Sequence, residues 1–268
     1  MIEIAYLPGR GVVEVAGEDR VSFLQGLVSN DVTGAAPGRA VWAALLSPQG
    51  KWLADFFILA DAERLLLDCA RDQAPMIAQK LSRFRLRAKV SVRDASAEWH
   101  VHAVWGGVPQ PTPGNVFAAD PRLSDAGWRI LANAPMAADG TAAWDSHRLA
   151  LGLPDPCDME TDKTVLLEAG FDELNGVSWT KGCYMGQELT ARTKYRGLIK
   201  RRLVPVTISG PPPAPGSILM RDGIEVGVMR SSQGAIGLAT MRLEALAQPV
   251  VLEGTALTPS IPGWMRLG

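Results

Sequence analysis

The last third of the chain is the part whose sequence most narrows the choice of fold. Its apolar segments are short and are separated by glycines and by Pro211-Pro212-Pro213. Five such segments follow one another: Leu203 to Ile208, Ile218 to Met220, Glu225 to Met229, Ala235 to Met241 and Val250 to Leu257. Short strands at regular spacing, joined by turn residues, are typical of a small barrel or sandwich. We therefore predict a β-barrel at residues 198–268, preceded by a region of different character at residues 1–197.

That preceding region alternates between strand-like and helix-like segments. Val41 to Leu46 and Trp52 to Leu59 flank Ser47-Pro48-Gln49-Gly50, which predicts a hairpin. Helices are predicted where apolar residues recur every three or four positions. These helices run from Gly17-Glu18-Asp19 to Ser29-Asn30, from Gln73 to Phe84, from Ala142 to Leu151, and from Gln187 to Arg196. Mixed strands and helices in this order indicate an α+β fold.

Composition and charge exclude several classes of function. Of the 268 residues, 27 are Lys or Arg and 28 are Asp or Glu, which leaves a net charge of -1. This balance gives no electrostatic reason to bind nucleic acid or an anionic membrane, so neither partner is expected. No uninterrupted apolar run approaches the roughly 18 residues of a membrane helix. The opening Met1-Ile2-Glu3-Ile4 lacks the features of a secretory signal or transit peptide, which predicts a cytoplasmic protein.

Residues that bind metals are few and scattered. The three cysteines, Cys69, Cys157 and Cys183, do not form a C-x-x-C pair. His100 and His102 share one face of a predicted strand, but no further Cys, His or carboxylate ligands stand near them in the sequence. We therefore expect no permanently bound metal.

The densest cluster of functional residues lies between Asn175 and Arg192. Here Cys183 is flanked by Gly182 and Gly186, which allow the backbone to turn sharply and hold the thiol outside regular structure. A neighbouring Lys181 and a helix predicted to follow would lower the pKa of the thiol and favour the thiolate, the form that ligates metals and attacks electrophiles. The alternative is that Cys183 is a small buried apolar residue.

This segment resembles a known family signature. Lys181-Gly182-Cys183-Tyr184-Met185-Gly186-Gln187-Glu188 is similar to the K-G-C-Y-x-G-Q-E motif of the YgfZ-type folate-binding proteins, which are relatives of the glycine-cleavage T-protein, an aminomethyltransferase. Further landmarks stand in family order: Phe23 to Gly26, Asn30 to Val32, Ser47 to Lys51, Arg148 to Pro154, and Leu166 to Arg202. The run from Leu167 through the motif is most similar to the mitochondrial branch, whose members help to mature [4Fe-4S] proteins.

The resemblance implies a fold and a set of binding residues. The family fold has three lobes, two of them intertwined α+β lobes and the third a C-terminal β-barrel, around a channel that holds tetrahydrofolate or a one-carbon folate. Glu168 matches the carboxylate that accepts the paired N–H groups of the pterin, and Trp144 matches a tryptophan beside the folate. Arg10 stands where some relatives have a second tryptophan. Without the resemblance, Glu168 would be interpreted as a solvated side chain and Trp144 as a core residue.

A basic run follows the motif. Its six cations are Arg192, Lys194, Arg196, Lys200, Arg201 and Arg202. Such a run could attract the glutamate tail of folate or an acidic partner, although most of its members are expected to form a solvated face. Arg192 is the member that we assign to the folate channel, because it lies one helical turn after Glu188.

The resemblance also implies a function with two rivals. We expect a tetrahydrofolate-binding accessory factor in the maturation or repair of [4Fe-4S] proteins, working with assembly proteins or with client enzymes such as those that thiolate tRNA. Cys183 would transiently ligate or shield a cluster, or react as a redox thiol. One rival is a folate-dependent aminomethyltransferase or other one-carbon transferase. The T-protein, however, has two adjacent aspartates near Ala54-Asp55, and only Asp55 remains here. The other rival is a folate-binding scaffold with a structural cysteine.

Overall fold

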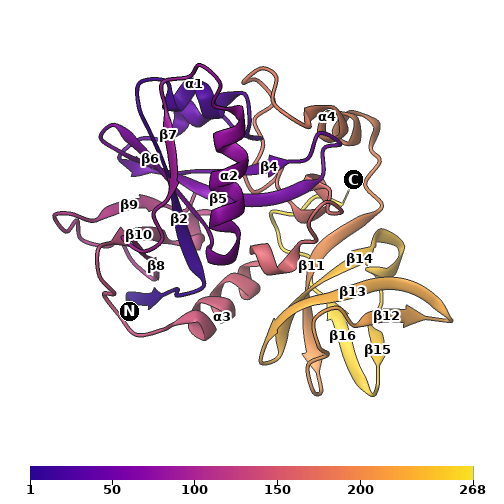
Figure 1. Cartoon of the computed structure of the whole chain (residues 1–268). Helices are drawn as coiled ribbons and strands as arrows, with labels where there is room; N and C mark the ends of the chain where they lie inside the picture. The colour runs from indigo at the N-terminus through magenta and orange to yellow at the C-terminus, as the bar shows by residue number, and fades with distance from the viewer. Residues whose placement is uncertain (268) are drawn as a thin grey trace. The chain divides into compact units, whose positions relative to one another are not determined.

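The computed structural model describes residues 1–267, which form two compact units (Figure 1). Unit 1 comprises residues 1–48, 53–141 and 175–187. Unit 2 comprises residues 49–52, 142–174 and those from 188 onward. Each unit is therefore assembled from segments that lie far apart in the sequence.

Unit 1 contains two five-stranded sheets. The strands of the first sheet, in spatial order, are β1 (Glu3–Tyr6), β8 (His100–Trp105), β10 (Trp128–Ala132), β9 (Val116–Ala119) and β3 (Gly38–Arg39). Those of the second are β4 (Val41–Leu46), β5 (Trp52–Asp61), β6 (Arg64–Ala70), β2 (Arg10–Ala16) and β7 (Ser91–Asp94). The predicted hairpin is present as β4 and β5. The parallel pairing of β3 with β9 contrasts with the antiparallel pairing of β2, β5, β6 and β7.

The apolar core of unit 1 lies between the second sheet and two helices, α1 (Arg20–Gln25) and α2 (Ala74–Phe84). The helices contribute Leu24, Ile77 and Leu81 to this core, opposite alternate residues of β2, β5 and β6. Alternate strand positions point to one face of a sheet, so a single apolar face is buried here. The apolar residues at alternate strand positions thus pack against the apolar residues at helical spacing on α2.

Helix α1 is shorter than the sequence predicts. It ends at Gln25, whereas its apolar spacing predicted a helix reaching Ser29-Asn30. The cause is tertiary: Val28 forms a β-bridge with Leu45, and the Ser29 N–H donates to the carbonyl of Ala44. Hydrogen bonds to the edge of β4 therefore replace the last helical turn.

Unit 2 contains the predicted barrel. Its six strands, in spatial order, are β12 (Ile218–Arg221), β13 (Ile224–Gln233), β14 (Ile236–Arg242), β11 (Arg201–Ser209), β16 (Thr255–Pro259) and β15 (Val250–Leu252). The end strands β12 and β15 lie against each other, so the barrel is nearly closed. Its interior is packed with valine, leucine, isoleucine and methionine side chains.

The remaining helical elements connect these parts. The longer ones are α3 (Thr141–Leu151) and α4 (Gln187–Arg196). The short 3-10 turns are η1 (Val32–Gly34), η2 (Arg71–Gln73), η3 (Ser124–Ala126), η4 (Pro156–Asp158), η5 (Leu166–Ala169) and η6 (Leu243–Ala245). The predicted boundary between residues 197 and 198 falls between α4 and β11. Within residues 1–267, no helix is long and apolar enough to cross a membrane.

Candidate functional site

Cys183 lies in a loop of unit 1, residues 175–187, which we call the cysteine loop. Gly182 and Gly186 adopt φ angles of +93° and +79°, a region that favours glycine. Cys183 is exposed, whereas the next residue, Tyr184, is only 6% exposed. The predicted sharp turn is therefore present, and Cys183 is exposed next to a buried aromatic residue in the sequence.

Hydrogen bonds fasten the cysteine loop to the end of α1 and the segment that follows it. The Ser29 hydroxyl, which is fully buried, donates to the carbonyl of Gly176 over 2.6 Å. The Ser178 N–H donates to the carbonyl of Ser29 over 3.1 Å, and the Met185 N–H donates to that of Gly26 over 3.2 Å. Both ends of the loop are thus attached to residues about 150 positions earlier in the chain.

Lys181 has a structural role that the sequence did not predict. Its ammonium group donates to the carbonyls of Val28 and Asn30 over 2.7 and 2.8 Å. Burial lowers the pKa of Lys181 to about 8, against the opposing charge of Asp31. These two hydrogen bonds fasten the cysteine loop to the segment after α1, and activation of the Cys183 thiol by Lys181 stays a prediction.

The helix predicted to follow Cys183 is present with the predicted bounds. Helix α4 begins at Gln187, four residues after Cys183, so the thiol lies outside its first turn. The Gln187 side-chain oxygen accepts a hydrogen bond from the Tyr184 N–H over 3.3 Å. Cys183 is thus an exposed residue on an anchored loop.

The other two cysteines have less reactive surroundings. Cys69 lies in β6 and is fully buried, and its burial raises the pKa of its thiol. Cys157 is exposed as a residue, so exposure alone does not single out Cys183. Burial of its sulfur and the charge of Asp158 raise the pKa of Cys157, although Arg148 approaches that sulfur to 3.6 Å.

In unit 2, Glu168 lies where two adjoining pockets meet, and we call the pair the Glu168 cleft. The pockets have volumes of about 250 and 720 Å³. They share the residues Glu168, Arg201, Glu225, Val228 and Thr240. Four of these come from the barrel strands β11, β13 and β14, and Glu168 comes from η5. The barrel wall and one 3-10 turn therefore form the cleft.

The electrostatics of the cleft are mixed. The Glu168 side chain is only 16% exposed, and burial raises the pKa of its carboxyl, against the opposing charges of Arg201 and Lys51. The Arg201 Nε lies 3.8 Å from a Glu168 oxygen. Lys200 and Arg242 line the larger pocket. A half-buried carboxylate with cations nearby fits the two ends of a folate, since the pterin offers paired donors and the glutamate tail is anionic.

The other two residues that we assigned to folate lie elsewhere in unit 2. Trp144, on α3, is 2% exposed, and its ring centre lies 5.7 Å from that of His147. Arg192 is exposed on α4 and lines a shallow groove with Glu188 and Tyr195. Neither residue lines the Glu168 cleft. Their assignment to folate stays a prediction.

The predicted basic run does not form one solvated face. Arg202 is 1% exposed, and its guanidinium lies 2.9 Å from a Glu173 oxygen. Lys194 pairs with Asp172, and Arg201 faces Glu168. Only the remaining three members, Arg192, Arg196 and Lys200, are exposed without a carboxylate partner among residues 1–267. The alternation of β11 directs Arg202 inward, which a count of charges cannot reveal.

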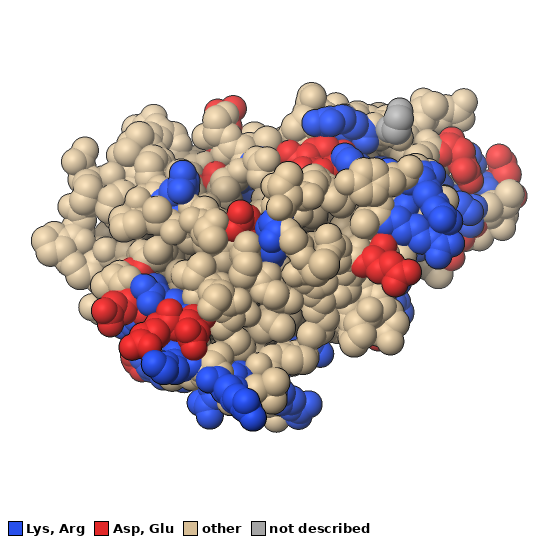
Figure 2. All heavy atoms as spheres, turned by 90° about the horizontal axis from the view of Figure 1, so that it is seen from above, with Lys and Arg blue, Asp and Glu red and all other residues tan. Residues whose placement is uncertain are grey.

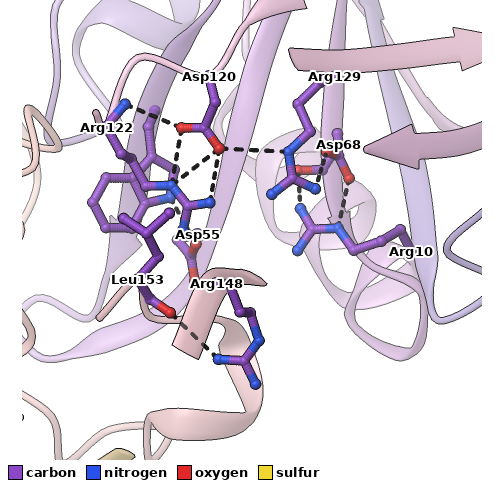
Figure 3. Close-up of polar contacts among 9 residues, drawn as sticks. Arg10, Asp55, Asp68, Asp120, Arg122, Arg129, Arg148 and Leu153 are labelled. Atoms are coloured by element: carbon purple, nitrogen blue, oxygen red, sulfur yellow. Dashed lines mark hydrogen bonds and ion pairs between the residues drawn. The ribbon is translucent and has the colours of Figure 1, made fainter. Parts of the chain in front are cut away.

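Sequence reasoning missed a buried ionic layer between the two sheets of unit 1 (Figure 3). Arg10 of β2 contacts Asp68 of β6 over 2.7 Å, and Arg129 of β10 lies 3.6 Å from the same carboxylate. Arg129 also lies 3.7 Å from Asp120, which Arg122 contacts over 2.8 Å. Burial lowers the pKa of Arg129 to about 10, against the opposing charge of Asp68. The layer thus joins the first sheet to the second.

Aromatic rings complete this layer. The Phe57 ring centre lies 4.2 Å from the guanidinium carbon of Arg129 and 4.8 Å from that of Arg122, a distance typical of cation–π contacts. Asp55, the carboxylate near the T-protein's aspartate pair, is 2% exposed and accepts a hydrogen bond from the indole of Trp42 over 2.8 Å. Asp68 within an apolar strand was the sequence signal that could have revealed the layer.

Charges on the surface are dispersed. Figure 2 shows one face, on which basic and acidic side chains form small groups separated by broad uncharged areas. This pattern agrees with the net charge of -1. The residues that the structure describes include no group of three or more His, Cys, Asp and Glu side chains able to hold a metal ion.

Comparison with known proteins decides the family. The chain is 35% identical to the iron–sulfur cluster assembly factor IBA57 of Mus musculus and 32% identical to that of Homo sapiens. Each alignment covers 96% of this chain and 84% of the relative. The chain belongs to the IBA57 family. This confirms the resemblance to the mitochondrial iron–sulfur assembly branch.

Two further similarities concern the fold of this IBA57 family member. Residues 200–267 match the family described as "CAF17, C-terminal beta-barrel domain", which is the segment predicted to form a barrel. The structure is also similar to the crystal structure of the glycine cleavage system aminomethyltransferase T from Bartonella henselae, with a TM-score of 0.78, 16% identity, and coverage of 98% of this chain and 85% of that one. The predicted aminomethyltransferase-like α+β fold is thereby confirmed.

The comparisons also correct one prediction. The IBA57 relatives from Mus musculus and Homo sapiens are both named as mitochondrial proteins. They contradict the cytoplasmic location that the opening residues suggested. Those few residues do not determine the compartment.

Proposed function

We propose that this chain is a tetrahydrofolate-binding accessory factor in the maturation or repair of [4Fe-4S] proteins, of the YgfZ type. Membership of the IBA57 family supports the iron–sulfur process. The observation that carries the chemistry is the exposed Cys183 on an anchored loop. Its partners are then iron–sulfur assembly proteins and client enzymes.

Cys183 acts in this proposal as a transient ligand to the cluster that is being transferred or repaired. A thiolate is the soft ligand that iron–sulfur clusters use. The thiol loses its proton on binding iron, and the sulfur takes the place of another ligand. Fastening by Ser29 and Lys181 keeps the loop in place, while the turn at Gly182 and Gly186 leaves Cys183 exposed. The step needs no change in the oxidation state of the sulfur.

Tetrahydrofolate would occupy the Glu168 cleft. Glu168 accepts the paired pterin donors, while Arg201, Lys200 and Arg242 attract the anionic tail. When bound, tetrahydrofolate supplies a reduced pterin and nitrogens that can carry a one-carbon unit. The chain itself contributes binding and orientation.

A complementation experiment tests the cysteine. We expect Cys183→Ser to fail in restoring the activity of [4Fe-4S] enzymes, including those that thiolate tRNA, in a strain that lacks the gene. Cys157→Ser is the matched control, because it is also exposed, and it should complement fully. Full complementation by Cys183→Ser would show that the thiol is not the functional group.

Calorimetry with tetrahydrofolate tests the cleft. Glu168→Gln should weaken binding by about 1.5–3 kcal/mol, the range for a hydrogen bond to a charged group. Glu225 lines the same pockets, so Glu225→Gln is the matched control, and it should bind tetrahydrofolate as the wild type does. Equal affinity in the wild type and in Glu168→Gln would remove Glu168 from the site.

An activity assay separates this proposal from aminomethyl transfer. Asp55 is buried against Trp42, so we expect no appreciable activity in a reconstituted glycine-cleavage assay. A robust rate there would favour the transferase instead.

A further inference from the structure

A second exposed feature lies in unit 1, at the end of α2 and in the turn that follows it (Figure 1). We call residues 80–89 the basic turn. They contain five cations and no acidic residue: Lys80, Arg83, Arg85, Arg87 and Lys89. Residues 82–87 are all exposed. The near-zero charge of the whole chain, from which we predicted no membrane partner, averages over this local excess.

The tip of the basic turn is a leucine. Leu86 is 90% exposed and has a φ angle of +42°, in the left-handed region that strains a leucine backbone. The Ala88 N–H donates to the carbonyl of Arg85 over 2.7 Å, which closes the turn. Phe84, two residues earlier, is 37% exposed. The fold therefore holds an apolar side chain in water on a strained backbone, and the described chain offers it no packing in return.

Most cations of the basic turn are not paired. Lys89 contacts Glu18 over 2.9 Å, and its N–H donates to Asp19 over 2.7 Å, so the end of the turn is fixed. The other four cations have no carboxylate within ion-pair distance among residues 1–267. The dipole of α2 favours a cation such as Arg83 in its last turn, but it accounts for neither Arg87 nor the apolar tip.

We propose that the basic turn is a docking site for the surface of an anionic lipid bilayer. Cations attract acidic headgroups, and an apolar side chain at the centre of the cluster enters the boundary between headgroups and acyl chains. The docked segment would be the convex tip around Leu86, with Arg83, Arg85 and Arg87 at the headgroups. The inference is independent of folate and of Cys183.

The shape of the basic turn favours lipid over an acidic protein as the partner. A stable protein interface buries about 800 Å² per partner around a desolvated apolar centre. The basic turn presents one leucine and part of one phenylalanine, interleaved with cations. A fluid headgroup layer adapts to such a convex tip, and no preformed recess is needed.

Co-sedimentation of the full chain with vesicles tests this proposal. We expect binding to phosphatidylcholine vesicles that contain about 30 mol% phosphatidylglycerol, none to phosphatidylcholine alone, and release by added salt. Arg83→Gln/Arg85→Gln/Arg87→Gln should bind about 100-fold more weakly, because each basic side chain at an anionic surface contributes about fivefold, or about 1 kcal/mol.

Two further variants separate docking from folding. Leu86→Gly removes the apolar tip and relieves the left-handed strain, so it should bind about tenfold more weakly while melting no lower than the wild type. Arg192→Gln/Tyr195→Ser/Arg196→Gln alters a comparable exposed set on α4 and should bind as the wild type does.

Three results would overturn the proposal. One is the absence of binding to anionic vesicles. Another is equal binding by the wild type and the basic-turn variants. The third is binding to poly-glutamate without binding to vesicles, which would assign the basic turn to an acidic protein.

Discussion

Replacing Ser29 by alanine should detach one end of the cysteine loop without touching the thiol. The hydroxyl donates to the carbonyl of Gly176 over 2.6 Å and accepts from the N–H of Ala44 over 2.9 Å. All three residues are buried, so Ser29→Ala leaves one buried acceptor and one buried donor unsatisfied. Each costs about 1–3 kcal/mol. With partial relaxation of the loop, we expect the free energy of unfolding to fall by about 2–4 kcal/mol.

Urea denaturation followed by circular dichroism measures this loss. Ser22→Ala is the matched control, because Ser22 is exposed and donates to a nearby carbonyl, and it should change stability by less than about 0.5 kcal/mol. Hydrogen exchange of the amides from Gly176 to Met185 should accelerate in Ser29→Ala. A stability loss as small as the control's, or unchanged exchange in the loop, would refute the view that Ser29 fastens it.

Three further predictions concern other parts of unit 1 and the cysteines. Asp120→Asn removes the negative charge beside two buried guanidinium groups and should lower the free energy of unfolding, measured by urea denaturation, by about 3–5 kcal/mol. The control Asp125→Asn changes an exposed residue and should lower it by less than about 0.5 kcal/mol. Equal losses would contradict the ionic layer. At mildly acidic pH, mass spectrometry should find Cys183 alkylated before Cys157, because burial raises the pKa of Cys157; simultaneous labelling would contradict this. Folding lowers the pKa of Lys181 to about 8, below its unfolded value of about 10.4. Between these two pH values the unfolded state binds more protons, so the stability of the wild type relative to Lys181→Met should rise between about pH 8 and about pH 10. A difference in urea midpoint that stays constant over this range would contradict the shift.

Local features of the sequence determined the elements and the family. The turn residues Ser47 to Gly50 predicted the hairpin, and the apolar spacing of residues 73–84 predicted α2. Short strands after residue 200 predicted the barrel. These features depend on neighbours within a few positions, where side-chain period and turn chemistry act directly. The cysteine motif is contiguous too, and with the run before it the motif predicted the iron–sulfur assembly branch to which the IBA57 relatives belong.

Only the tertiary structure decided which charged groups meet. Lys181 donates to carbonyls about 150 residues away, and Arg129 reaches Asp68 across two sheets. Arg202 is buried although its neighbours in the basic run are exposed. Strand register and sheet packing choose these partners, and neither is written in a local pattern. Composition could not reveal these partners, because a net charge of -1 does not say where the charges lie. The same value is compatible with a dispersed surface, a buried ionic layer and a locally basic turn.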